Sequence, residues 1–203
     1  MFRDDILLLQ LFVLAWWIME NFKIKWPLSN KKTMVSTKIF DIVSFETLSP
    51  RTRKAFTFYR LECGDWVNIL PLTRDNQVVL VNQYRAGTDE FSLEIPGGLI
   101  DNGEDPAAAA LRELKEETGY TTSRDNLIDL GYILPNPAIQ NNKCFLYTAK
   151  NVKMTDPQNL DDQEDIQIIL MPYEKFLQKI TGGEIKHSLV LNTVFKHELF
   201  NKK

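Results

Sequence analysis

The most informative segment of this chain is GLIDNGEDPAAAALRELKEETGY, residues Gly98–Tyr120. Within it, Asp105 is a typical helix N-cap, Pro106 suits the first helical turn, and Gly119 is a typical stop. The alanine-rich and charged residues between them have high helix propensity. The sequence therefore predicts a helix over residues 106–118, preceded by a loop that contains glycine.

Three glutamates of this helix gather on one face, because Glu113, Glu116 and Glu117 stand at positions i, i+3 and i+4. Like charges at this spacing destabilise an isolated helix, and a bound divalent cation would remove that penalty. Oxygen ligands favour Mg²⁺ or Mn²⁺ over zinc. Arg112 precedes Glu116 by one helical turn and can pair with it. A charged, solvated helix face is the alternative interpretation of the same pattern.

The segment resembles the signature of the Nudix hydrolase family, G-x5-E-x7-R-E-U-x-E-E-x-G-U, in which U is a bulky aliphatic residue. Every fixed letter is present, from Gly98 and Glu104 to Gly119, and a chance match is on the order of 10⁻⁹ per start position. The last position holds the aromatic Tyr120, which we expect to pack against the sheet. The resemblance implies an α/β (α+β) fold, a Nudix-type α/β/α sandwich with a mixed β-sheet and a loop-helix-loop catalytic motif.

The resemblance also implies roles for the matched residues. Arg112 and Glu104 correspond to the pair that holds the loop on the helix, and Gly119 is a structural residue of the motif. Arg112 and Glu116 belong to the catalytic group. The implied ligands of Mg²⁺, for which Mn²⁺ is a possible substitute, are Gly97 (through its carbonyl), Glu113, Glu116 and Glu117. The implied chemistry is metal-assisted attack of water on a pyrophosphate bond, with a carboxylate taking the proton of the water.

Residues outside the motif resemble the ADP-ribose and ADP-sugar pyrophosphatase branch of the family. The matching segments are NQYR (Asn82–Arg85) and LEIPGGLID (Leu93–Asp101), with Gly97 in place of the usual alanine. Pro135 falls where that branch carries a marker proline. The branch implies cleavage to AMP (or another NMP) and a sugar phosphate. The implied substrate-binding residues are Arg85, Glu94, Gly98 and Pro135.

Three of the candidate residues have more than one interpretation. Arg85 would contact a phosphate through its guanidinium fork, or form a surface ion pair. Glu94 would serve the metals or the terminal ribose, or be an ordinary carboxylate at a strand end. Glu164 is our candidate for the general base, although the acidic run 161–165 is also typical of a solvated loop.

Two other functions also fit the sequence. GDP-mannose or another nucleotide sugar shares the same framework and is the alternative substrate. A non-catalytic nucleotide-binding Nudix module is an alternative of a different class, although such degenerate modules usually lose one or more of the glutamates that are intact here.

The rest of the chain predicts a mixed sheet with helices packed against it, because strand-like segments come first and helices are interspersed later. The predicted strands are Val35–Leu48, Ala55–Glu62, Trp66–Leu72, Gln77–Tyr84, Phe91–Ile95, Leu127–Leu134, Cys144–Ala149 and Ile166–Met171. Further helices are expected over Pro172–Ile180 and His187–Leu199.

The family resemblance also implies a homodimer, because family members form dimers by exchanging N-terminal strands. The strand-rich segment 35–72 suits such an exchanged element. Trp26, Phe40 and Phe45 are available to stack on a base, although a core or interface role is the favoured interpretation of each.

Charge and cysteine content narrow the choice of partners and compartment. The net charge is −3, so no basic excess points to a nucleic acid, and a small nucleoside diphosphate sugar is the expected partner. The two cysteines, Cys63 and Cys144, are too few for a disulfide framework. We expect free thiols and a cytoplasmic location.

Residues 6–19, ILLLQLFVLAWWIM, are almost wholly apolar. This run is shorter than the roughly 20 residues that a membrane-spanning helix needs. It has three interpretations: an extension upstream of a functional start at Met19, an apolar helix that packs on the domain or a partner, or a membrane anchor, which is the least favoured. We assign 1–34 to an N-terminal extension and connecting segment, and 35–203 to a Nudix hydrolase domain.

Overall fold

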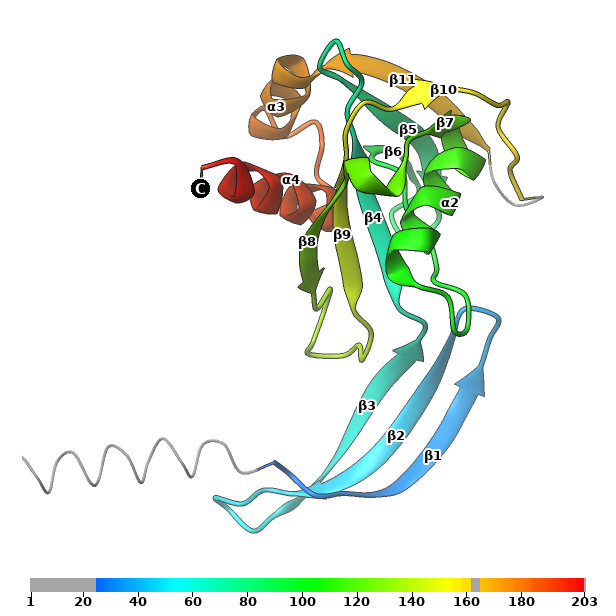
Figure 1. Cartoon of the computed structure of the whole chain (residues 1–203). Coiled ribbons are helices and arrows are strands. Elements are labelled where there is room, and N and C mark those ends of the chain that lie inside the picture. Colours follow the sequence, from blue (N-terminus) through cyan, green and yellow to red (C-terminus); the bar gives the residue numbers. More distant parts are fainter. Residues whose placement is uncertain (1–24, 162–164, 203) are drawn as a thin grey trace, which may run out of the picture. The chain divides into compact units, whose positions relative to one another are not determined.

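The structure is a computed structural model that describes residues 25–161 and 165–202. The chain divides into two compact units, residues 1–61 and 62–203, whose elements are labelled in Figure 1. The apolar run 6–19 lies outside the described residues. Within the described part of the chain, no helix is long and apolar enough to cross a membrane.

The first unit is a sheet of three strands in the order β1-β2-β3. They are β1 (Leu28–Ser36), β2 (Phe40–Leu48) and β3 (Ala55–Cys63). The predicted single strand Val35–Leu48 is wrong, because the chain reverses within it. The Thr37 hydroxyl accepts the N–H groups of Ile39 and Phe40, at 3.3 and 3.1 Å, and β2 pairs antiparallel with β1. The turn at Thr37 separates β1 from β2. Most of β1 lies within residues 1–34, which we predicted to be an N-terminal extension and connecting segment.

The second unit is built on two three-stranded sheets and one short pair of strands. The sheets have the orders β4-β9-β8 and β11-β5-β6, and the pair is β10-β7. Their bounds are β4 (Trp66–Pro71), β5 (Gln77–Arg85), β6 (Glu90–Glu94), β7 (Tyr120–Thr121), β8 (Leu127–Ile133), β9 (Cys144–Ala149), β10 (Lys153–Met154) and β11 (Ile166–Pro172). β4 runs parallel to β9, whereas β8 with β9 and β5 with both its neighbours are antiparallel. The predicted mixed arrangement is confirmed.

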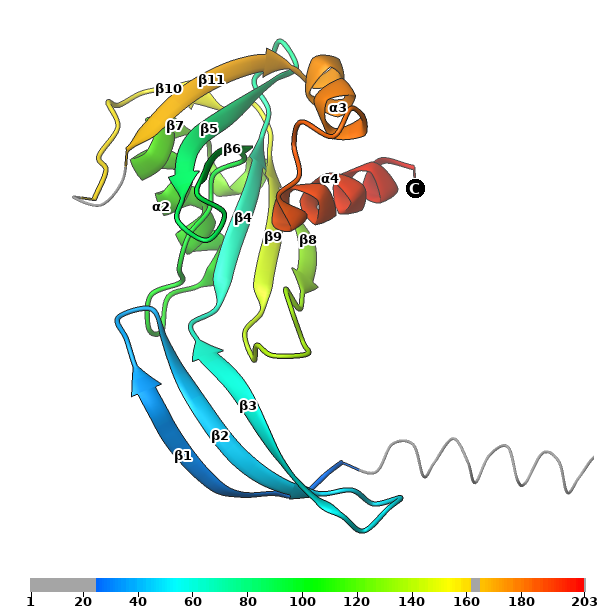
Figure 2. The ribbon, with the colours of Figure 1, turned by 180° about the vertical axis from the view of Figure 1, so that it is seen from behind.

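Helices cover both faces of these sheets, as the views from the front and from behind show (Figures 1 and 2). They are α2 (Pro106–Thr118), the 3₁₀ turn η1 (Arg124–Asn126), α3 (Tyr173–Thr181) and α4 (Ser188–Asn201). On β5, Val79 faces the core under α2, and Val78 and Leu80 face the core under α3 and α4. Because both faces of β5 are buried, the strand is apolar at every one of these positions.

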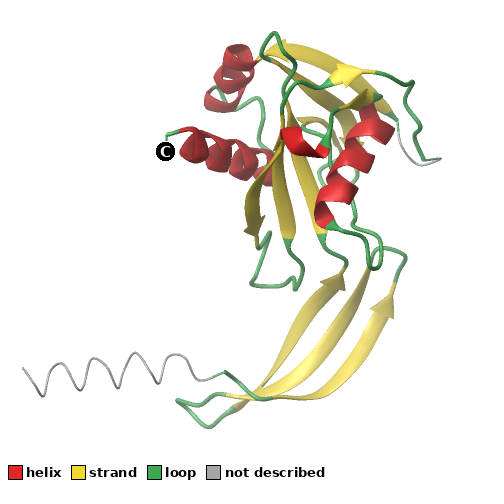
Figure 3. Ribbon diagram, viewed as in Figure 1, coloured by secondary structure: helices red, strands yellow, loops and turns green. Residues whose placement is uncertain are grey.

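The helix α2, one of the helices drawn in red in Figure 3, has the caps that the sequence predicts. The Asp105 carboxylate accepts the N–H of Ala108 at 3.2 Å, and Gly119 ends the helix with φ +68°. A Cβ at Gly119 would meet the carbonyl oxygen of Asp156 at 2.0 Å, so only glycine fits. Tyr120 lies in the core with 9% exposure, which confirms its predicted packing.

A buried histidine ties α4 to β9. His197 Nδ1 lies 2.9 Å from the Thr148 hydroxyl, and its Nε2 lies 2.9 Å from the amide nitrogen of Asn201. Since an amide nitrogen only donates, Nε2 accepts and Nδ1 carries the proton. Burial lowers the pKa of His197, and the nearby Glu198 opposes this shift only in part. The ring therefore holds α4 on the sheet in its neutral form.

We expect the free energy of unfolding to fall as the pH drops below about 6.5. A histidine with a lowered folded pKa binds its proton more readily when unfolded, so its contribution is complete above the unfolded pKa and declines as the pH falls through it. Urea unfolding at pH values from about 8 to about 5 measures this dependence. His197→Gln should give a shallower slope over that window, and a slope equal to that of the wild type would contradict the assignment. Some slope remains, because the pKa of His187 is lowered too.

Candidate active site

Arg112 joins the loop before α2 to the helix itself. Its guanidinium donates to both oxygens of Glu104, each at 2.9 Å, and to the carbonyl of Leu99 at 3.0 Å. The same group donates to Glu113 and Glu116, both at 2.9 Å. The predicted pairs of Arg112 with Glu104 and with Glu116 are therefore both present, and a single planar fork binds three carboxylates.

The charges of this network stabilise one another. Hydrogen bonds from Arg112 hold the pKa of the Glu104 carboxyl below its ordinary value, because they outweigh its partial burial. The bond to Glu104 likewise raises the pKa of Arg112. Glu104 also accepts the N–H of Asp101 at 3.0 Å, so that it fixes the backbone of its own loop. The loop and the helix thus form one electrostatic unit.

Glu117 is held by the backbone of the preceding loop. Its side chain is buried, with 2% exposure, and it accepts the N–H of Gly97 at 3.0 Å. The carbonyls on either side, of Pro96 and Gly98, both accept N–H groups of β4 at 2.9 Å. Because carbonyls alternate along an extended segment, the Gly97 carbonyl points away from β4, on the side of Glu117. This is the orientation that a metal-ligating carbonyl needs.

The two glycines of this loop have no room for a side chain. A Cβ at Gly97 would meet the Val67 carbonyl oxygen at 2.3 Å, and one at Gly98 would meet Glu113 Oε1 at 2.4 Å. The close approach of the loop to β4 therefore requires glycine at position 97, and a side chain at position 98 would displace the Glu113 carboxylate.

The donors of this region fit a hard divalent cation. They are carboxylates and one carbonyl, the ligand type that Mg²⁺ prefers, and Glu113 and Glu117 are both buried. In the part of the chain that the structure describes, no group of three acidic, His or Cys side chains is already arranged around one point. The reason is that Arg112 and the Gly97 N–H hold these carboxylates at separate positions. Metal binding would require them to turn from these partners.

A cavity of about 330 Å³ lies beside Gly97 and Gly98. Arg85 and Glu94 line it, and their side chains form a two-pronged ion pair through bonds of 2.9 and 2.7 Å. Burial raises the pKa of the Glu94 carboxyl, but Arg85 outweighs this effect, so that the pKa is lowered overall. The other lining residues are Trp66, Val67, Asn68, Leu99, His187 and Leu189. The structure thus brings Arg85, Glu94 and Gly98 together, with the Arg85 fork placed on Glu94.

Sequence reasoning did not single out His187 or Asn68. His187 stands at the start of α4, with Nε2 at 3.7 Å from Glu94 Oε2. Asn68, on β4, is buried and donates to the carbonyl of Pro96 at 3.2 Å, which fixes the glycine loop. Neither residue belongs to a local motif, and only the pairing of β4 and α4 with the loop reveals them.

Of the two remaining predicted residues, one lies outside this group. Pro135 lies half-buried between β8 and β9, and it is not among the described residues that line the cavity. Glu164 falls outside the described residues, so its assignment as general base stays a prediction.

Comparisons with known proteins agree with the geometry. Residues 65–191 match the NUDIX domain family. The methanol dehydrogenase activator of Bacillus methanolicus is 35% identical over 124 residues, which cover 60% of this chain and 65% of that protein. The ADP-ribose pyrophosphatase of Bacillus subtilis (strain 168) is 31% identical over 119 residues, covering 59% and 64%. The chain thus spans slightly less than two thirds of these curated relatives.

A solved structure shares the fold. The crystal structure of an ADP compounds hydrolase superposes with a TM-score of 0.76 at 22% sequence identity, covering 88% of this chain and 95% of that chain. The predicted sandwich is therefore confirmed at the level of the fold.

We expect Arg112→Lys to lower the free energy of unfolding by about 2 kcal/mol, because an ammonium cannot reproduce the planar fork that binds three carboxylates. Equilibrium unfolding in urea measures the change. The matched control is Arg124→Lys, whose partner Asp105 forms an exposed ion pair with it, and whose replacement should cost less than about 0.5 kcal/mol. Equal losses in the two variants would show that the Arg112 network contributes no more than a surface pair.

Proposed function

Because the chain belongs to the Nudix family, we propose that it is a Mg²⁺-dependent hydrolase of ADP-ribose or a related nucleoside diphosphate sugar. Cleavage of the pyrophosphate bond gives AMP (or another NMP) and a sugar phosphate. The observation that carries this proposal is the set of buried carboxylates that faces the glycine loop, beside a cavity that contains Arg85. The relative named ADP-ribose pyrophosphatase supports the choice of substrate.

The residues that would hold Mg²⁺ are Glu113, Glu116, Glu117 and the carbonyl of Gly97. When bound there, the ion would supply neutralisation of the pyrophosphate charge and a lower pKa for a coordinated water. Mn²⁺ has the same preference for oxygen ligands and is a possible substitute. Arg112 holds Glu113 and Glu116 on one face of the helix, and both carboxylates would have to turn from its guanidinium to accept a cation.

The protein side chains then bind and orient the substrate. Arg85 contacts a phosphate oxygen with its guanidinium fork, while part of that fork stays on Glu94. Gly98, without a side chain, lets the phosphates approach the carboxylates. Glu164 takes the proton of the attacking water, and the sugar phosphate or the nucleotide leaves with the cleaved bridging oxygen.

We also propose that the enzyme is a cytoplasmic homodimer. Both described cysteines, Cys63 and Cys144, are free thiols, which suits a reducing compartment. The sheet of the first unit exposes Phe58 and the nearby Trp26, whose rings meet edge to face at 6.0 Å, and every residue of β1 is exposed. An exposed aromatic sheet surface of this kind suits a second copy of the chain.

The first test is hydrolysis of ADP-ribose by the purified protein with Mg²⁺, with GDP-mannose in parallel and the products separated by chromatography. We expect AMP and ribose 5-phosphate, with a higher kcat/KM for ADP-ribose. Preference for GDP-mannose would move the substrate to the other nucleotide sugars. Hydrolysis of neither compound, with metal still bound, would favour a nucleotide-binding module.

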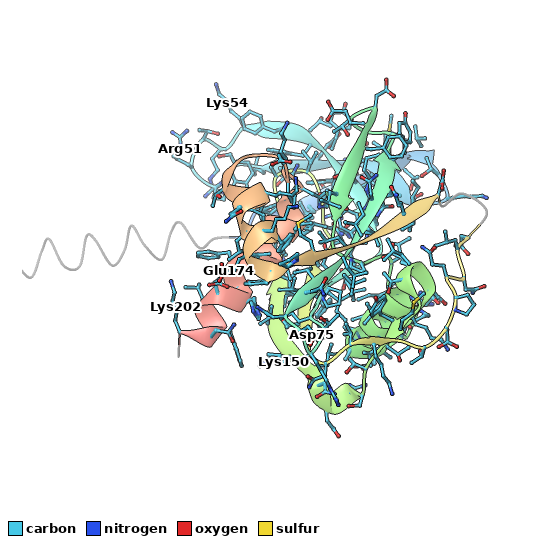
Figure 4. The ribbon with its side chains drawn as sticks, turned by 90° about the horizontal axis from the view of Figure 1, so that it is seen from above. Arg51, Lys54, Asp75, Lys150, Glu174 and Lys202 are labelled. Carbon is cyan, nitrogen blue, oxygen red and sulfur yellow. The ribbon has the colours of Figure 1, made fainter. Side chains whose placement is uncertain are left out.

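Glu117→Gln should lower kcat at least about 100-fold, because it removes a charge that stabilises the transition state through the cation. The matched control is Glu174→Gln. Figure 4 shows Glu174 on α3, on the far side of the sheets from α2, and its side chain is exposed. Thermal unfolding of both variants establishes that they are folded. Wild-type turnover by Glu117→Gln would remove this glutamate from the proposed metal ligands.

Light scattering should give a mass near twice the 23.5 kDa of one chain. The double variant Trp26→Ser and Phe58→Ser should dissociate to monomers, because it removes the exposed aromatic pair from the proposed interface. Lys32→Ser, an exposed change on β1, is the control and should stay dimeric. A monomeric wild type would refute the dimer.

A further inference from the structure

Among the described residues that line the cavity, His187 offers a buried ring nitrogen without a hydrogen-bond partner and lies beside the Arg85–Glu94 ion pair. No part of the described chain makes a hydrogen bond to either of its ring nitrogens. Nδ1 is buried, whereas Nε2 lies 3.7 Å from Glu94 Oε2, beyond the 2.7–3.2 Å range that is typical of a hydrogen bond. A histidine held so close to a carboxylate without bonding to it leaves both groups able to bind one ligand atom that lies beside them.

The proton of the neutral ring belongs on Nε2. A carboxylate at 3.7 Å favours a donor at the nitrogen that faces it, and a proton on the buried Nδ1 would have no acceptor. His187 therefore presents an N–H group next to the Glu94 oxygen, as a donor that stands beside an acceptor.

Glu94 has room for one further donor. A carboxylate can accept about four hydrogen bonds. Arg85 supplies two of them, which leaves Glu94 able to accept a further donor. The matching ligand group must therefore accept a hydrogen bond from His187 and donate one to Glu94.

We propose that His187 and Glu94 together bind one hydroxyl group of the sugar of the substrate. This inference rests on the function proposed above and names two residues that recognise the sugar. A single hydroxyl oxygen can span the 3.7 Å between Nε2 and Oε2, accepting from the first and donating to the second. A phosphate cannot replace it, because at neutral pH a phosphate oxygen only accepts and would repel Glu94.

The position in the cavity agrees with a sugar. Gly97 and Gly98 line the cavity and also adjoin Glu117 and Glu113, so a group beside His187 is next to the place proposed for the phosphates. The apolar side chains of Trp66, Leu99 and Leu189 line the remainder of the cavity, and they suit the carbon skeleton of the sugar or a base.

The test measures equilibrium binding of the two expected products to the full chain by titration calorimetry. Each product is compared with an analogue that lacks the sugar hydroxyls. The pairs are ribose 5-phosphate with tetrahydrofurfuryl phosphate, and AMP with 2′,3′-dideoxy-AMP. We expect the wild type to bind the hydroxyl-bearing member of one pair about tenfold more tightly, which corresponds to the loss of one hydrogen bond. His187→Leu should abolish that preference, and His187→Gln, which restores an N–H donor, should recover part of it.

Lys186→Gln is the control, because Lys186 is exposed and adjacent to His187 in the sequence, and it should keep the wild-type preference. Thermal unfolding of each variant separates loss of binding from loss of fold. A wild type without preference in either pair, or a preference that survives in His187→Leu, overturns the proposal. Since product binding needs no turnover, failure of ADP-ribose hydrolysis would refute the proposed reaction while leaving this test of His187 decisive.

Discussion

The arrangement of the candidate site depends on Arg112. Its guanidinium binds three glutamates and a backbone carbonyl, and these partners come from the loop before α2 and from α2 itself. Without the positive charge of the Arg112 guanidinium, Glu113 and Glu116 would repel each other on one helix face. The guanidinium offsets their negative charges, and both carboxylates keep the ability to accept further hydrogen bonds. The loop and the helix are thereby fixed to each other before any ligand arrives.

A second constraint acts from the opposite side. The segment from Pro96 to Leu99 pairs with β4 through alternate residues, and the Gly97 N–H turns to Glu117. One short piece of backbone thus carries a sheet contact on one side and a carboxylate contact on the other. A Cβ at Gly97 would collide with the backbone of β4, so the closeness of the loop to the sheet depends on this glycine, whereas a Cβ at Gly98 would push the Glu113 carboxylate aside.

The sequence predicted those parts of the site whose residues lie close together along the chain. The caps of α2, the pairs of Arg112 and the approach of the glycine loop all involve residues close together along the chain. The ion pair of Arg85 with Glu94 already requires the β5–β6 hairpin, so the sequence named both residues without joining them. His187 joins the cavity from a helix nearly a hundred residues further on. The reversal between β1 and β2 was missed because a hydrogen-bonded threonine turn, with no glycine or proline, interrupts what reads as one strand.

The carboxylates of α2 come from one short segment, whereas the residues of the cavity wall come from segments far apart in the chain. The positions of the α2 carboxylates are set by helix periodicity, and in the proposed reaction they would serve any phosphate-bound cation and carry no information about the rest of a substrate. The groups that can distinguish one diphosphate from another lie across the glycine loop, where β5, β6 and the start of α4 bring Arg85, Glu94 and His187 into one cavity wall. Changes in the side chains of that wall can alter the substrate while the bonds of Arg112 stay in place, because none of these three side chains is a hydrogen-bond partner of Arg112. A fold built in this way can keep one reaction while its substrate changes.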